Sequence, residues 1–254
     1  MTDTVPYAAP DSKAGSFHAE GRTVAAGRGW DWIVEAFALF RRQPGVWILI
    51  VLFAGILFIA ISMVPVLGSL ASALLFPIFA GGLMLGCRDL DQGRSLEIAH
   101  LFSGFKDKAG NLVMIGVFNL VGWVIIAFAV AAVAGGGVLM GVMRGGIEGA
   151  GLSIASLLLA ALLVAALSVP LYMATWFAPA LIVLGDLAPV AAVKASFFAC
   201  LGNWIPFMVY SVVLLLLCAV AAIPAGLGFL VLIPVLAASV YTAYGDIFCA
   251  EKET

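Results

Sequence analysis

Charge is scarce in this sequence. Only 10% of its 254 residues are Asp, Glu, Lys or Arg, and 64% are hydrophobic; an average soluble domain has about 25% charged residues. Because so few polar side chains cannot cover a water-soluble globule of this length, lipid must be the solvent for much of the chain. The net charge of −2 also argues against a nucleic-acid partner, which needs a basic face to displace counterions.

Motifs of catalysis and metal binding are absent as well. His100 has no second His or Cys at ligand spacing and is expected to be a solvated surface histidine. There is no Walker loop, no HExxH and no GxSxG in a suitable setting, and no Ser, His and Asp form a credible triad. The sequence therefore predicts no enzyme, no metal and no cofactor. Four scattered cysteines, without a CxxC, are expected to be reduced and apolar: Cys87, Cys200, Cys218 and Cys249.

Long hydrophobic runs are what the sequence has instead. Residues 46–88 are almost unbroken hydrocarbon, interrupted only at 65–68. One helix of that length would measure roughly 60 Å, about twice the hydrocarbon thickness of a bilayer, so this stretch must fold back as two spans. The pattern recurs, and we predict an all-α polytopic membrane bundle of six transmembrane helices arranged as three hairpins. The expected spans are 46–64, 69–88, 112–134, 152–184, 204–223 and 229–248.

The flanks of the six-span domain, residues 29–249, are polar. Residues 1–28 contain prolines and glycines without the apolar core of a signal peptide, so we expect a disordered cytoplasmic tail, and residues 250–254 form a second tail. With six spans, every Lys and Arg except Arg144 falls on one side of the membrane. The positive-inside rule then predicts a multi-pass protein of the bacterial inner membrane with both termini in the cytoplasm.

A short amphipathic segment precedes each hairpin, at 30–43, 95–106 and 189–201. In the first segment, apolar residues recur at helical spacing on one face: Trp30, Ile33, Val34, Phe37 and Phe40. We expect an interfacial helix there, with Trp30 and Trp32 at headgroup level and Arg41 and Arg42 against anionic lipid. A specific lipid or partner site is the alternative.

Two stretches leave alternatives open. Gly137, Gly141, Gly145 and Gly149 recur every fourth residue within 135–151. Such spacing makes a smooth ridge on a helix, but each glycine also costs a helix roughly 1 kcal/mol. The stretch is therefore either a flexible extracytoplasmic loop or a glycine-lined helical extension. The fourth span is longer than one crossing needs and contains two prolines, so it is either kinked or broken.

An aspartate comes closely after a glycine at the end of each even-numbered span: Asp89, Asp186 and Asp246. Glycine commonly ends a helix and aspartate caps the next one, so local helix geometry alone explains the pattern. The alternative is a ring of carboxylates at the cytoplasmic mouth that holds a cation.

Two sets of residues carry a resemblance to known families. The first comprises Gly29-Trp30, Phe40-Arg41-Arg42, Pro44, 64–68, Phe76-Pro77, 81–83 and 100–102, and the second 177–180, Asp186, 189–196 and 202–204. Together they resemble uncharacterised bacterial six-span membrane families and are similar to the membrane domain fused to some glycerophosphodiester phosphodiesterases. The resemblance implies a six-helix inner-membrane bundle. It carries over no catalytic residue, because the phosphodiesterase chemistry belongs to a separate soluble domain.

The function most consistent with this inventory is a non-catalytic membrane scaffold or accessory subunit for a protein or lipid partner, or for another copy of the chain. The alternative is a permease or channel for a small or apolar solute, and an enzyme acting on lipid ranks last. No predicted span has a charged residue near its centre. Since proton-coupled transporters usually place such residues there, the sequence argues against that class.

Overall fold

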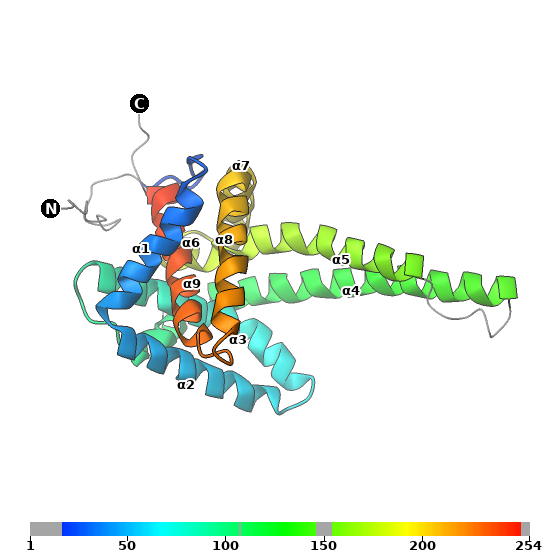
Figure 1. Cartoon of the computed structure of the whole chain (residues 1–254), viewed down its shortest axis with the longest axis horizontal. Coiled ribbons are helices and arrows are strands. Elements are labelled where there is room, and N and C mark those ends of the chain that lie inside the picture. Colours follow the sequence, from blue (N-terminus) through cyan, green and yellow to red (C-terminus); the bar gives the residue numbers. More distant parts are fainter. Residues whose placement is uncertain (1–16, 107, 146–153, 250–254) are drawn as a thin grey trace.

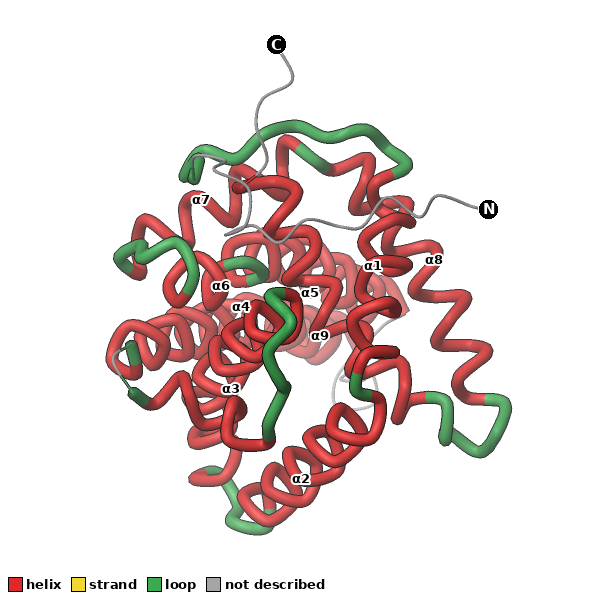
Figure 2. The backbone as a smooth tube through the Cα atoms, turned by 90° about the vertical axis from the view of Figure 1, so that its left-hand side faces the viewer, coloured by secondary structure: helices red, strands yellow, loops and turns green. Residues whose placement is uncertain are grey.

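The computed structural model describes residues 17–106, 108–145 and 154–249. Within these ranges every regular element is helical, which confirms the predicted all-α class (Figure 2). Six helical segments are long and apolar enough to cross a membrane, and they differ from the expected spans by a few residues at their ends. They are Pro44–Ser62, Leu67–Asp91, Ala109–Val133, Leu157–Val183, Trp204–Ala222 and Phe229–Cys249.

A short helix, a long helix and a second long helix succeed one another three times along the chain. The first unit is α1 (Arg28–Arg42), α2 (Pro44–Ser62) and α3 (Leu67–Asp91). The second is η1 (Ile98–Phe105), α4 (Ala109–Gly145) and α5 (Ile154–Thr175), which α6 (Ala178–Val183) continues. The third is α7 (Pro189–Gly202), α8 (Trp204–Ala222) and α9 (Phe229–Tyr244), and the π-helical turn η3 (Gly245–Cys249) comes after it.

The long helices do not form a parallel stack. In Figure 1, α4 and α5 lie side by side and extend well beyond the other helices, while α8 and α9 run across them. The start of α1 and the end of α9 lie together at the top of that view, and the α2–α3 and α8–α9 turns lie at the bottom. The first and last helices are therefore neighbours in space, and α1 packs along α9.

The glycine-rich stretch is helical as far as the structure describes it. Helix α4 has 37 residues and includes Gly137, Gly141 and Gly145, so the loop interpretation of 135–145 is wrong. Gly149 lies outside the described residues. A helix of this length is about 55 Å long, whereas the hydrocarbon core of a bilayer is about 30 Å thick. Helix α4 therefore extends beyond a single crossing.

The fourth span is broken rather than smoothly kinked. Helix α5 ends at Thr175, and α6 begins two residues beyond Trp176, with Pro179 in its first turn. Ser196 on α7 bridges the break, because its hydroxyl accepts the Phe177 N–H at 3.0 Å and donates to the Met173 carbonyl at 2.7 Å. One side chain thus satisfies backbone groups that the missing helical turn leaves without partners.

One face of helix α1 packs into the core of the bundle. Trp32 is fully buried, whereas Trp30 and Phe37 are exposed, so the buried face is rotated from the one that the apolar spacing predicted. The headgroup position predicted for Trp32 is therefore wrong. Gly29 explains the close fit, because a Cβ there would lie 2.1 Å from the Pro206 carbonyl oxygen of α8.

Residues 17–28 are bound to the bundle, so the disordered-tail prediction is wrong for them; residues 1–16 and 250–254 lie outside the described part of the chain. The backbone N–H groups of His18 and Arg22 donate to the Phe248 and Ile247 carbonyls at the end of η3, each at 2.9 Å. Buried Asn203 accepts the Val24 N–H at 2.8 Å and donates to the Arg22 carbonyl at 2.9 Å. The segment therefore satisfies carbonyl groups that a helix end leaves free.

Candidate functional site

Charged side chains gather in two clusters that join distant parts of the sequence. The first surrounds Asp246, which is 7% exposed. Its carboxylate accepts hydrogen bonds from Arg22 Nη2 at 2.8 Å, Arg28 Nε at 2.6 Å and Trp32 Nε1 at 2.9 Å. Arg22 Nε also donates to the Asp246 carbonyl oxygen at 2.7 Å. Asp246 therefore connects η3, the N-terminal segment and α1 through charge-assisted hydrogen bonds.

Glu35 extends the Asp246 cluster along α1. Arg28 Nη2 donates to Glu35 Oε1 at 3.1 Å, so this arginine bridges two carboxylates. Burial raises the pKa of Glu35 above its ordinary value, and the attraction of Arg28 only partly offsets that effect. The Asp246 carboxylate is the part of this cluster that links separate elements, because its partners Arg22 and Arg28 belong to the N-terminal segment and α1.

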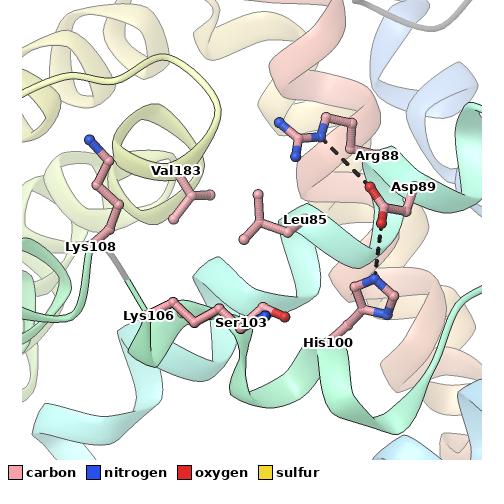
Figure 3. Close-up of a pocket in the computed structure, with 9 residues that line it drawn as sticks. Leu85, Arg88, Asp89, His100, Ser103, Lys106, Lys108 and Val183 are labelled. Carbon is pink, nitrogen blue, oxygen red and sulfur yellow. Dashed lines mark hydrogen bonds and ion pairs between the residues drawn. The ribbon is translucent and has the colours of Figure 1, made fainter.

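The second cluster lines a cavity of about 360 Å³ between α3, η1, the start of α4 and α6 (Figure 3). Three cationic side chains and one carboxylate lie in its wall, together with a histidine, a hydroxyl and apolar groups: Arg88, Lys106, Lys108, Asp89, His100, Ser103, Leu85, Gly104 and Val183. Arg88 lies on α3, and Lys106 and Lys108 lie in the connection between η1 and α4. The described lining therefore has an excess of positive charge.

Small residues on α3 and η1 bring the two cavity walls together. A Cβ at Gly104 would lie 2.1 Å from the Ile78 carbonyl oxygen, and one at Gly82 would lie 2.4 Å from the His100 carbonyl oxygen. Glycine is required at both contacts because any side chain would push η1 away from α3. The short helix starts with a reciprocal capping box between Glu97 and His100.

His100 is not a solvated histidine, because its side chain is only 15% exposed and pairs with Asp89. Its Nδ1 accepts the Glu97 N–H at 3.0 Å, so Nε2 carries the proton and donates to Asp89 Oδ2 at 3.1 Å. Both ring nitrogens are therefore engaged. A general base in a catalytic triad needs one nitrogen free to accept the nucleophile's proton, and this arrangement does not supply it.

The three aspartates predicted as a possible ring have different surroundings. Asp89 pairs with Arg94 at 2.5 Å and with His100, Asp186 pairs with Lys108 while remaining 81% exposed, and Asp246 is buried between arginines. Each carboxylate already has a basic partner, so the ring hypothesis loses its basis. Among the described residues, no group of His, Cys, Asp and Glu is arranged to hold a metal.

The remaining predicted lipid contacts divide into two kinds. Arg41 and Trp30 are exposed, and Trp30 is 53% exposed on the outer face of α1. Arg42 instead donates to the Leu90 carbonyl at 2.8 Å and faces Asp91 at 3.8 Å. Arg42 thus holds the end of α1 against the end of α3, which a count of positive residues does not reveal.

Sequence reasoning missed the cavity itself. Arg88, Lys106 and Lys108 served only as indicators of orientation, because nothing in their spacing shows that they share a cavity. The Glu97-x-x-His100 spacing was a usable signal, since it matches the three-residue offset of a capping box with histidine in the final position. The convergence of Arg88, Lys106 and Lys108 on one cavity depends on the contact between η1 and α3.

Comparison with known proteins finds a relative of the chain. Over 226 residues the chain is 33% identical to "Probable inner membrane protein BTH_II0599" of Burkholderia thailandensis, covering 86% of this chain and 82% of that protein. No family model matches the chain. No solved structure matches it either.

Proposed function

Because the chain belongs to the same family as the probable inner membrane protein BTH_II0599, we propose that it is a non-catalytic scaffold or accessory subunit of the bacterial inner membrane. Its six apolar helical segments contact the lipid bilayer. The proposed partner is a second membrane-spanning helix or hairpin, from another protein or from a second copy of the chain.

The exposed α4–α5 hairpin is the observation that carries this proposal. The most apolar window of the α5 span contains no residue buried within the chain, and Leu158 and Leu162 are both 66% exposed. The hairpin also extends away from the other helices (Figure 1). Beyond residue 133, α4 continues with Gly137, Gly141 and Gly145 at four-residue spacing, the pattern that allows a second helix to approach closely.

The charged groups support a structural role as well. The Asp246 carboxylate pairs with Arg22 and Arg28, which fastens η3 to the N-terminal segment and α1, and both nitrogens of His100 are engaged. These arrangements stabilise the bundle, and among the residues that the structure describes they leave no evident general base, which is why we propose that the chain is not an enzyme. The resemblance to the membrane domain of some glycerophosphodiester phosphodiesterases enters the proposal only as a shared membrane layout.

The permease alternative needs a path through the broken fourth span. Phe177, at the break, is fully buried, and Ser196 closes the gap with two hydrogen bonds. This packing favours the scaffold over the permease. For orientation, we propose that the end bearing most of the Lys and Arg residues faces the cytoplasm, with both termini on that side.

A photocrosslinking amino acid at Leu158 in native membranes tests the scaffold proposal. We expect a discrete protein adduct, of twice the mass of the chain if the partner is a second copy. The matched control is Leu215 on α8, which is 70% exposed and equally apolar. Leu215 should give lipid adducts only. Lipid adducts alone at both positions would overturn the proposal.

A further inference from the structure

We propose that the cavity between α3, η1, α4 and α6 binds a phosphate-bearing anion, and that its ligand is the headgroup of an anionic phospholipid. This site goes beyond the scaffold role and does not depend on it, on the orientation of the chain or on a protein partner. The proposal rests on the charges that converge there, on how the cavity is built and on its position at the end of a membrane span.

The charge of the lining selects an anion. Arg88, Lys106 and Lys108 face the same volume of about 360 Å³, and the only carboxylate among the described lining residues is Asp89. Asp89 is paired with Arg94 and His100, and Arg88 Nε lies 3.9 Å from its Oδ1; Figure 3 shows the contacts with His100 and Arg88. Lys106 and Lys108 therefore carry the excess positive charge of the lining. Guanidinium and ammonium groups together favour a phosphate, because its oxygens accept several charge-assisted hydrogen bonds at once.

The cavity can accept a ligand without breaking the fold. Lys108 pairs with Asp186, but that carboxylate is 81% exposed, so its pairing is screened by water and is readily exchanged for a phosphate. His100 and Asp89 are fixed by the capping box at the start of η1. The wall is therefore held in place while Lys108 is able to turn toward the ligand.

The position of the cavity favours a lipid over a soluble phosphate ester. Arg88 lies near the end of the candidate span Leu67–Asp91, where headgroups meet water. Phe102 and Phe105 of η1 are each 41% exposed and pack edge-on against Phe79 of α3. These rings do not line the cavity, but they belong to the same short helix as its lining residues Ser103 and Gly104, and the lining itself includes the apolar Leu85 and Val183. Apolar groups near the cations match a ligand with a phosphate at one end and an acyl chain at the other.

Native mass spectrometry of the full chain in dodecylmaltoside tests the proposal, with phosphatidylglycerol, phosphatidylcholine and glycerol 3-phosphate as probes. We expect the wild-type protein to retain one phosphatidylglycerol in preference to phosphatidylcholine. Lys106→Gln/Lys108→Gln should weaken that binding about tenfold or more, because two charged donors are lost. Lys106→Arg/Lys108→Arg should keep it. The control is Lys194→Gln, compared with the single variants Lys106→Gln and Lys108→Gln, because it removes one positive charge from an exposed position on α7 outside the cavity.

The arms of this experiment separate the two sources of phosphate. Binding of glycerol 3-phosphate with the same dependence on the lysines, but without preferential retention of phosphatidylglycerol, would support the phosphate site and assign it to a soluble ester. Equal weakening in the cavity and control variants, or no binding of any phosphate probe, would overturn the proposal. The thermal midpoint of each variant is also measured with and without glycerol 3-phosphate at constant ionic strength. The change in midpoint on adding the ester reports binding even in a variant whose fold is altered.

Discussion

Replacing Asp246 by Asn should destabilise the protein strongly. The carboxylate accepts three side-chain hydrogen bonds from Arg22, Arg28 and Trp32 within 2.9 Å, and it is only 7% exposed. Asparagine has nearly the same shape, but its amide group is a donor that faces arginine donors, and it carries no charge. Breaking a buried pair in this way costs about 3–5 kcal/mol. For a chain of this size, that cost corresponds to a fall of roughly 10 °C in the thermal midpoint.

Asp186→Asn is the matched control, because Asp186 also comes after a glycine at the end of an even-numbered span. Its carboxylate is 81% exposed, and its ion-pair partner is the side chain of Lys108. Exposed pairs contribute about 0–1 kcal/mol. Asparagine also tolerates the positive φ of 53° at this position. The control should therefore unfold within about 3 °C of the wild type.

Two measurements check the Asp246 prediction in the same detergent. Thermal unfolding gives the change in midpoint, and limited trypsin digestion reports whether the segment around Arg22 has left η3. We expect Asp246→Asn to be cleaved after Arg22 much faster than the wild type and the Asp186→Asn control. Unchanged cleavage together with an unchanged midpoint would refute the role assigned to this carboxylate.

Three further outcomes are expected from the same structure. Glu35→Gln should have a higher thermal midpoint than the wild type at pH 7 and should lose that advantage at pH 4. Burial raises the pKa of Glu35, so ionisation of this carboxyl costs folding free energy only as the pH rises through that pKa. A gain in midpoint that is independent of pH would contradict this reasoning. Gly104→Ala should cost about 1–3 kcal/mol in thermal unfolding because its Cβ would meet the Ile78 carbonyl at 2.1 Å, while Gly110→Ala, with open space around it, should be neutral or slightly stabilising. Reporter fusions after Gly149 should behave as periplasmic, and cytoplasmic activity there would reverse the proposed orientation.

The expected six-span layout could be predicted from the sequence because hydropathy depends on local composition. The helix breaks that separate the spans are also local, as Pro44 and the turn at 63–66 show. The face of α1 was a different matter. Apolar spacing placed Trp30 and Phe37 with Phe40, whereas the contact of Gly29 with α8 turns Trp32 into the core. Two faces of α1 are apolar enough to be buried, so only its neighbours select between them.

The aspartates show most clearly which features the sequence determines and which depend on the tertiary structure. By itself the sequence determined that the chain is all-helical, that lipid surrounds it, and that aspartates lie at the ends of the even-numbered spans. Only the tertiary structure decided that Asp246 is buried against Arg22 and Arg28, more than 200 residues away, while Asp186 remains in water. The physical reason is that lipid acts on every apolar stretch alike, whereas a charge pair and a shared cavity exist only where particular helices meet.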